Sequence, residues 1–340
     1  MDVLSDVLRV VRLTGSIFFT ANLSDPWSVA SPSSEVIIRH MPRKVECISL
    51  FHIITEGQCW FKTENGKRFS LQKGSVIIFP KCNSHIMCSN LNIYPVPLMK
   101  LLTFENIAGL TDVEYGGNGD RTQFICGYLL CDQRFNPLLG AVPEVITLLR
   151  SNGITKASEE ESNSKELPNA LNIDQDSWLD ITLNQLQKEV KGKNMGSSTM
   201  ITRLTELMYI EVLRRYMQGL PEKSNGWLAA LRDHEIGRAL RFLHAHPEKK
   251  WNVEQLASEV GVSRSAFAQR FTDLMGESPI RYLTGWRMQL AKSLLLRPDM
   301  NLSMVAERIG YDSDIAFNRA FKRYVGEPPA HWREQMRMQA

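Results

Sequence analysis

Histidine and cysteine side chains gather in one short stretch of the N-terminal half. Cys82, His85 and Cys88 follow one another at intervals of three residues, and thiol and imidazole groups of this kind can bind a soft metal ion or react with an oxidant. We expect them on a strand that leaves a turn, where they could converge with His52 or Cys59. We favour the structural alternative, because cysteine is among the most buried residue types and a lone histidine is usually a hydrogen-bonded core residue.

Two predicted helices in the C-terminal third each expose a face that can read the edges of DNA bases. Phenylalanines four residues apart mark the opposite, inward face: Phe267 and Phe271 in one helix, Phe317 and Phe321 in the other. Gln and Asn pair with adenine and Arg with guanine, while Ser and small apolar side chains approach the thymine methyl group. The candidate DNA-contacting residues are Arg264, Ser265, Ala268, Gln269 and Thr272 in the first helix, and Ser313, Asp314, Ile315, Asn318, Arg319 and Lys322 in the second.

Taken alone, each of these side chains would more often be an ordinary solvated surface residue. The structural context decides whether they form a DNA-contacting face. Asp314 is the least suited to reading, because a carboxylate repels phosphate unless it accepts a hydrogen bond from cytosine or caps the helix.

An internal repeat supplies that context. Five residues of the first copy recur 49 residues later, and five more recur at an offset of 50. The matched pairs are Val253/Leu302, Leu256/Val305, Ala257/Ala306, Val260/Ile309, Gly261/Gly310, Phe267/Phe317, Phe271/Phe321, Gly276/Gly326, Pro279/Pro329 and Tyr282/Trp332. Each copy predicts a helix, a turn at the glycine, and a second helix capped by Ser263 in one copy and by Asp312 or Ser313 in the other. The sequence therefore predicts two helix-turn-helix units, at about 253–274 and 302–324.

The second unit carries a long motif that resembles the signature of AraC/XylS-type transcription regulators. It runs through Gly310–Ser313, Ala316–Arg323, Gly326–Pro329 and Trp332-Arg333. The resemblance implies two helix-turn-helix units joined by a central helix, matched here by 279–296, that enter successive major grooves of double-stranded DNA. It also implies base-reading roles for Ser265, Ala268, Gln269, Asp314, Ile315, Asn318 and Arg319.

The N-terminal half predicts strands and tight turns. Short Val, Ile and Phe runs between residues 36 and 87 are separated by glycine turns, and Asn65-Gly66 is a strong hairpin signal. Gly74, Pro80, Cys82 and His85 resemble the second cupin motif, with Cys82 where a glycine is usual. Lys44, Glu46 and Leu50 stand at about the first-motif ligand positions, so the three-ligand metal set is missing and a conventional metal-cupin enzyme is disfavoured.

Further stretches resemble the cupin-type sensor half of one AraC-type subgroup, so the resemblance covers nearly the whole chain outside an acidic linker. They are Met1–Leu8, Phe18-Phe19, Pro26-Trp27, Phe51-His52, Gly57, Cys59-Trp60, Cys126–Tyr128, Asn136–Leu139, Trp227-Leu228 and Trp286–Met288.

The middle of the chain predicts a solvated linker followed by two helices. Residues 151–176 contain a run of Ser, Glu and Asn with little to bury. Helical spacing then appears in Trp178, Ile181, Leu183 and Leu186, and after Gly196 in Met200, Leu204, Leu207, Met208, Ile210 and Leu213. Core packing and self-association remain equally open explanations of these apolar stripes.

Composition places the chain among ordinary globular proteins. It has 340 residues, 43% hydrophobic and 23% charged, and a net charge of +3, which fits two domains, each with a core of its own. The segment from 227 to 340 holds 17 Lys and Arg against 13 Asp and Glu, a mild basic excess that supports DNA binding only weakly. Six cysteines are too few for a disulfide scaffold. With neither a signal peptide nor a bilayer-spanning run, we expect a soluble, cytoplasmic protein that does not engage membranes.

The sequence thus predicts an α+β multidomain chain. We expect a cupin-like β-barrel sensor domain at 1–150, the acidic linker at 151–176, a helical linker or dimerisation region at 177–226, and an all-α DNA-binding domain with two helix-turn-helix units at 227–340. The predicted function is a sequence-specific regulator and not an enzyme. We expect it to bind double-stranded DNA as a homodimer and to sense an unknown small-molecule effector.

No catalytic residue, cofactor or firm metal site is predicted. Two alternatives stay open: a cupin-type dioxygenase or isomerase fused to a DNA-binding domain, and a regulator switched by a thiol or metal event at the histidine and cysteine residues named above.

Overall fold

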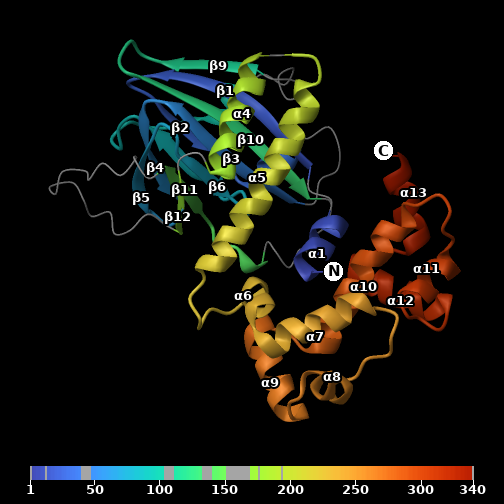
Figure 1. Ribbon diagram of the computed structural model, residues 1–340. Coiled ribbons are helices and arrows are strands. Elements are labelled where there is room, and N and C mark those ends of the chain that lie inside the picture. The colour runs from blue at the N-terminus through green and yellow to red at the C-terminus, as the bar shows by residue number, and fades with distance from the viewer. Residues whose placement is uncertain are drawn as a thin grey trace. The chain divides into compact units, whose positions relative to one another are not determined.

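The computed structural model of the chain describes residues 2–11, 14–39, 47–102, 111–131, 140–150, 169–174, 177–192 and 194–338. They divide into two compact units. One, the C-terminal unit, contains helix α1 (Val3–Val11) and residues 220–338, and the other, the barrel unit, contains the strands and the two helices that follow them (Figure 1). In these residues no helix combines the length and the apolar composition needed to cross a bilayer.

A seven-stranded sheet forms the larger layer of the barrel unit. Its central strands β3, β10 and β1 pair antiparallel, and both edge strands pair parallel with their neighbours. In spatial order the strands are β12 (Ala170–Ile173), β11 (Ile146–Arg150), β6 (Val76–Phe79), β3 (Cys47–Glu56), β10 (Arg121–Cys131), β1 (Thr14–Ser24) and β9 (Thr111–Gly116).

A five-stranded sheet forms the second layer. Its order is β5 (Arg68–Gln72), β4 (Gln58–Thr63), β7 (His85–Cys88), β2 (Ser28–Ser31) and β8 (Val96–Pro97). The predicted hairpin is confirmed, since β4 and β5 pair antiparallel across Asn65-Gly66 and Gly66 has a φ of 76°. Apolar side chains from both sheets form one core, in which Trp27, Phe61, Phe79 and Phe124 are fully buried. The short helices α2 (Ser34–Arg39) and η1 (Leu98–Lys100) complete this unit.

Helices α4 (Trp178–Gly192) and α5 (Ser197–Gly219) pack on each other, and α5 crosses strand β1 (Figure 1). The contact is close at Gly15, where a Cβ would lie 2.6 Å from the Thr205 side chain. Leu183, Leu186, Met208 and Leu213 of the predicted stripes are buried. Four other apolar side chains of these helices are exposed: Trp178, Ile181, Met200 and Leu207.

The predicted linker is wrong at its C-terminal end. Ala170–Ile173 form strand β12, which pairs parallel with β11, and Ile173 is fully buried. The short apolar segment gains its partner from a strand that precedes the linker, a pairing that composition does not reveal. Residues 151–168 lie outside the described part of the chain.

The C-terminal unit is entirely helical in its described residues. Helix α1, expected in the sensor domain, contacts α7 and α10 here and buries Val3, Leu4, Val7 and Val10. The remaining helices are α6 (Trp227–Arg232), α7 (His234–Ala245), α8 (Val253–Val260), α9 (Arg264–Met275), α10 (Pro279–Leu295), α11 (Leu302–Arg308), α12 (Asp314–Val325) and α13 (Pro329–Met338).

Candidate nucleic-acid interface

Helices α8 and α9 form the first predicted helix-turn-helix unit. Asn252 starts α8 in a capping box with Gln255, and Gly261 ends it with a φ of 82°. The Ser263 hydroxyl then accepts a hydrogen bond from the Ala266 amide at the start of α9. These short-range signals confirm the predicted helix, turn and helix.

Helices α11 and α12 form the second unit in the same way. Asn301 caps α11, and Gly310 supplies the left-handed residue of the turn, with a φ of 80°. Of the two proposed caps for α12, Ser313 is the one used, since its hydroxyl accepts from the Ala316 amide at 3.2 Å. The Asp312 carboxylate instead forms an ion pair with Lys250, 2.8 Å from its Nζ.

The inward faces of α9 and α12 are as predicted. Phe267, Phe271, Phe317 and Phe321 are at most 1% exposed. The rings of each pair lie 5.8 Å and 5.6 Å apart, and Phe321 makes an edge contact with Trp332. This aromatic packing holds each helix so that its opposite face is directed to solvent.

Those opposite faces expose most of the predicted DNA-contacting residues. Arg264, Ser265, Gln269 and Thr272 are exposed on α9, with Ala268 half-buried. On α12, Ile315 is 66% exposed, a costly position for a large apolar side chain unless another surface covers it. Arg319 and Lys322 are exposed beside it, Asn318 is half-buried, and the capping residue Ser313 is exposed.

Several of these side chains already have partners within their own helix. Gln269 Nε2 donates to Asp273 at 2.7 Å, the Thr272 hydroxyl donates to the Ala268 carbonyl, and Asn318 Nδ2 donates to the Asp314 carbonyl. These bonds are exposed or part-buried and orient the side chains along the helix surface. In the part of the chain that the structure describes, Arg319 and Lys322 form no ion pair.

Asp314 has a structural partner. Its Oδ2 accepts a hydrogen bond from the Ser303 hydroxyl at 2.6 Å, which ties the start of α12 to α11. A carboxylate in the first turn of a helix also interacts favourably with the helix dipole. Both interactions support a role in holding the unit together rather than in reading bases.

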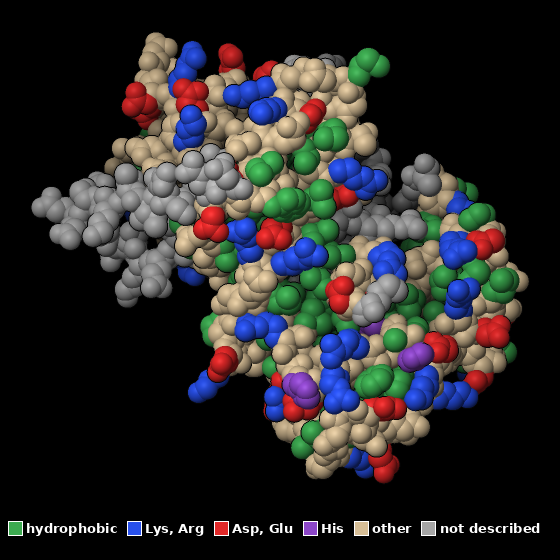
Figure 2. Space-filling model, viewed as in Figure 1, with side chains coloured by type: hydrophobic (Ala, Val, Ile, Leu, Met, Phe, Trp, Pro, Cys, Tyr) green, Lys and Arg blue, Asp and Glu red, His purple; other side chains and the backbone are tan. Residues whose placement is uncertain are grey.

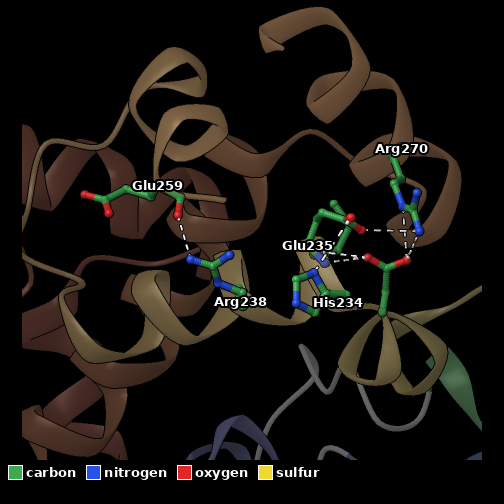
Figure 3. A network of polar contacts seen from close by, with 7 residues as sticks. His234, Glu235, Arg238, Glu259 and Arg270 are labelled. Atoms are coloured by element: carbon green, nitrogen blue, oxygen red, sulfur yellow. Dashed lines mark hydrogen bonds and ion pairs between the residues drawn. The ribbon is translucent and has the colours of Figure 1, made fainter. Parts of the chain in front are cut away.

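A polar network anchors α9 to α7. Arg270 donates to the Asp233 carboxylate through Nε and Nη2, at 3.0 and 2.6 Å, and its Nη2 lies 3.4 Å from Glu235 (Figure 3). Asp233 is also the N-cap of α7, accepting from the Glu235 and Ile236 amides. Partial burial alone would raise the pKa of Asp233, but the hydrogen bonds from the Ile236 amide and Arg270 lower it overall. One carboxylate therefore fixes both the start of α7 and the position of α9.

Helix α7 also holds α8. Arg238 Nη2 donates to the Glu259 carbonyl at 2.9 Å, near the C-terminal end of α8 (Figure 3). Both helices of the first unit are thus braced by α7.

Charge on the C-terminal unit is mixed. On the face in Figure 2, its Lys and Arg side chains are interspersed with Asp and Glu. This agrees with the small basic excess of the sequence. Side-chain chemistry on α9 and α12 is therefore a better guide to DNA recognition than net charge.

Two of the candidate sensor residues, His52 and His85, meet in the barrel interior together with Cys126. His52 Nε2 lies 2.9 Å from His85 Nε2, which joins the two sheets, and His52 Nδ1 lies 2.9 Å from Cys126 Sγ. His85 Nδ1 donates to the Asn83 carbonyl, so its Nε2 accepts from His52 and the Cys126 thiol donates to His52 Nδ1. His85 also stacks on Phe79, with ring centres 3.7 Å apart. The structure therefore brings His52 and His85 together as hydrogen-bonded core residues.

Burial keeps this chain of groups uncharged. It lowers the pKa of His85 to about 4 and that of His52 well below its ordinary value. It raises the pKa of the Cys126 thiol well above its ordinary value. Outside this chain, burial also raises the pKa of Cys59, that of Cys82 to about 12 and that of Cys88 to about 11. Protonated thiols are poor nucleophiles and poor metal ligands.

Cys82 has a further constraint. It is fully buried with a φ of 50°, a left-handed conformation that explains why a glycine suits this position of the cupin motif. Among the described residues, no group of three or more His, Cys, Asp or Glu side chains is arranged to hold a metal ion.

Sequence reasoning missed Cys126 as a partner of His52. The two residues lie directly opposite each other on β10 and β3, 74 positions apart in the chain, and no local spacing connects them. Arg270 was missed as well, because its partner Asp233 lies outside the repeat.

Two family models match this chain. A cupin model matches residues 2–163 and 156–218, and a helix-turn-helix domain model matches residues 256–335. A putative AraC-like transcription regulator of Streptomyces antibioticus is 27% identical, covering 98% of this chain and 99% of its own. The chain belongs to the AraC-type transcription regulators with a cupin domain.

One further relative matches nearly the whole chain, and one solved structure matches about a third of it. The HTH-type transcriptional regulator AlkR of Acinetobacter baylyi is 26% identical to this regulator, over 98% of this chain and all of its own. The DNA-binding domain of AdpA, solved with a target DNA, is 30% identical and covers 31% of this chain and 96% of its own, with a TM-score of 0.30.

Proposed function

We propose that this regulator reads two neighbouring segments of double-stranded DNA, one with α9 and one with α12. The supporting observation is that the two helices expose equivalent faces while identical phenylalanine pairs hold their opposite faces in the core. Ser265, Ala268 and Gln269 would read one segment, and Ile315, Asn318 and Arg319 the other. Arg264, Thr272, Ser313 and Lys322 would contact the DNA backbone, and Asp314 would support α12.

Selection from a random pool tests this proposal. Full-length protein is incubated with random double-stranded DNA, and bound molecules are recovered and sequenced. We expect enriched sequences with two conserved segments about one helical turn, or ~10 base pairs, apart. An enriched pool with no conserved sequence would contradict base reading by these helices.

We also propose that the barrel binds a small-molecule effector. The Cys126, His52 and His85 groups form an uncharged polar chain inside an apolar core. A ligand that enters between the sheets would have to replace these hydrogen bonds, which favours a molecule with uncharged donors or acceptors. Such a ligand shifts the regulator between states only through its differential affinity for them.

The raised thiol pKa values support a ligand receptor over a thiol switch. The names of the relatives, all transcription regulators, support a receptor over an enzyme. A thermal-shift screen of uncharged small molecules tests the receptor, with His52→Phe as the variant that should abolish any shift.

Finally, we propose that the regulator acts in the cytoplasm as a homodimer. Trp178 and Ile181 lie three residues apart on α4 and are 48% and 58% exposed. Met200 and Leu207 lie seven apart on α5 and are each 44% exposed. Each pair therefore occupies one side of its helix, and a second copy of the chain would cover these surfaces.

A further inference from the structure

The two helix-turn-helix units touch each other directly, besides being joined by α10. Gly310, in the turn of the second unit, lies against the loop that leads into α8. A Cβ on Gly310 would lie 2.3 Å from the Glu248 carbonyl oxygen and 2.7 Å from Arg287 Nη2. The equivalent Gly261 has nearly the same φ, yet nothing lies within 4 Å of its Cβ position. The approach at Gly310 is therefore a contact between units and not a general property of the turn.

Arg287, on α10, lies at the centre of this contact. Its Nε donates to the Pro247 carbonyl at 2.6 Å and its Nη2 donates to the Lys249 carbonyl at 3.0 Å. The guanidinium also lies 5.7 Å from the centre of the Tyr311 ring, in the turn of the second unit. Hydrogen bonds from a charged donor are stronger than neutral ones, so one side chain of the connecting helix holds the loop of the first unit beside the turn of the second.

Contacts within the loop hold its shape as far as the start of α8. Trp251 Nε1 donates to the His246 carbonyl at 3.0 Å, and Lys249 Nζ lies 3.8 Å from the centre of the Trp251 ring. The next residue, Asn252, caps α8. A displacement of the second unit would therefore have to move the loop, α8 and the α9 that packs on it.

We propose that Arg287 and Gly310 form a junction that fixes α9 relative to α12 and thereby sets the spacing between the two DNA segments that the regulator reads. This inference depends on the proposed reading of two segments. One inserted base pair moves a segment by ~3.4 Å and rotates it by ~35° about the DNA axis. A rigid junction cannot follow that change, whereas a loosened one can.

The test uses duplexes derived from the selected DNA. Base pairs are added or removed, one at a time, between the two conserved segments, and the affinity of full-length protein is measured by fluorescence anisotropy. For the native protein, one inserted base pair should weaken binding by about tenfold or more. For Arg287→Ala and Gly310→Ala, this penalty should fall below about threefold, while affinity for a single segment changes less than about twofold.

Matched controls separate the junction from its neighbourhood. Gly261→Ala imposes the same backbone strain at a turn with open space, and Arg281→Ala removes an exposed cation of α10 that pairs only with Glu277 in the described residues. Both should keep the native spacing penalty. Arg287→Lys retains the positive charge but cannot donate from two nitrogens. It provides a second test if Arg287→Ala fails to fold, and it should also lose the spacing penalty.

Two results would overturn the junction while leaving the proposed two-segment reading intact. One is a full spacing penalty in Arg287→Ala, Arg287→Lys and Gly310→Ala, which would leave two-segment reading intact but exclude the junction. The other is a native protein that tolerates inserted base pairs. Selection of a single conserved segment would overturn the proposed two-segment function together with this inference.

Discussion

The imidazole of His244 is hydrogen-bonded to the hydroxyl of Tyr282, with 2.8 Å between Nε2 and the oxygen. That oxygen also accepts a hydrogen bond from Trp227 Nε1, so its own proton is directed at His244 and the imidazole carries its proton on Nδ1. Trp286 stacks on the ring at 4.0 Å, and the Asp6 carboxylate of α1 lies 3.9 Å from Nδ1. Burial lowers the pKa of His244 to about 3.

This histidine should make the C-terminal unit less stable in mild acid. The unfolded chain takes up a proton near pH 6.5 that the folded state does not bind until about pH 3, so stability falls as the pH drops below 6.5. The loss approaches about 1.4 kcal/mol per pH unit for this one group. This loss of stability is measured by hydrogen exchange of α7 and α10 at pH 7.5, 6.0 and 5.0. The exchange rates are corrected for the pH dependence of intrinsic exchange.

His244→Phe should remove most of that pH dependence from α7 and α10. The exposed His234 provides the control, since His234→Ala should leave it unchanged. An identical pH response in His244→Phe would show that other groups govern the acid sensitivity of this unit.

Arg319 and Lys322 should affect DNA binding in different ways. Arg319→Ala removes a side chain that we propose pairs with a base, so affinity for the selected sequence should fall by about 1–3 kcal/mol and discrimination at one position should relax. Lys322→Ala should weaken all sequences alike and lower the slope of log affinity against log salt by about 1. Titrations on selected and scrambled duplexes at several salt concentrations distinguish them, and equal losses on both duplexes for Arg319→Ala would contradict base reading.

Asp314 should behave as a support of α12. Asp314→Ala loses the Ser303 hydrogen bond and the favourable helix-dipole interaction, so thermal or urea denaturation should show a loss of about 1 kcal/mol. Ser303→Ala should reproduce part of this loss, because it removes the same hydrogen bond from the other side. A changed base preference in a repeated DNA selection with Asp314→Ala would instead assign this carboxylate to a cytosine.

The parts that sequence predicted well are those held by short-range signals. The repeat gave both helix-turn-helix units because Ser263, Ser313 and the turn glycines act within a few residues of their own helices. The contacts that were missed join distant segments. His52 meets Cys126 through strand register, and Arg287 meets Pro247 across 40 positions, and neither pairing leaves a periodic trace in the chain.

Strand β12 was predicted to be linker because its own residues do not reveal its pairing partner. Its residues follow an acidic stretch and contain one Asn among three apolar side chains, too little for a strand signal. Pairing with β11 supplies the missing stabilisation, since it satisfies the backbone hydrogen bonds and buries Ile173.

Asp233 should couple the stability of α7 to the placement of α9. Asp233→Ala removes both the helix cap and the anchor of Arg270, and the cap alone contributes about 1 kcal/mol. Asp233→Asn keeps a good capping group and loses the ion pair, so it should be nearly as stable as the native protein. Both variants should weaken binding to the DNA segment read by α9, as measured on single-segment duplexes. Unchanged binding there would mean that α9 is positioned without this anchor.

Leu207 should contribute to self-association. Leu207→Glu places a charge on the exposed apolar side of α5 that Met200 shares, and burying that charge in an interface would be costly. Sedimentation equilibrium of full-length protein should show a dimer that dissociates at least about tenfold more readily in this variant. Gln218→Glu adds the same charge at an exposed position near the end of α5 and should leave the equilibrium unchanged. If both variants dimerise like the native protein, association uses a different surface, because a charge at the centre of a helical interface cannot be neutral.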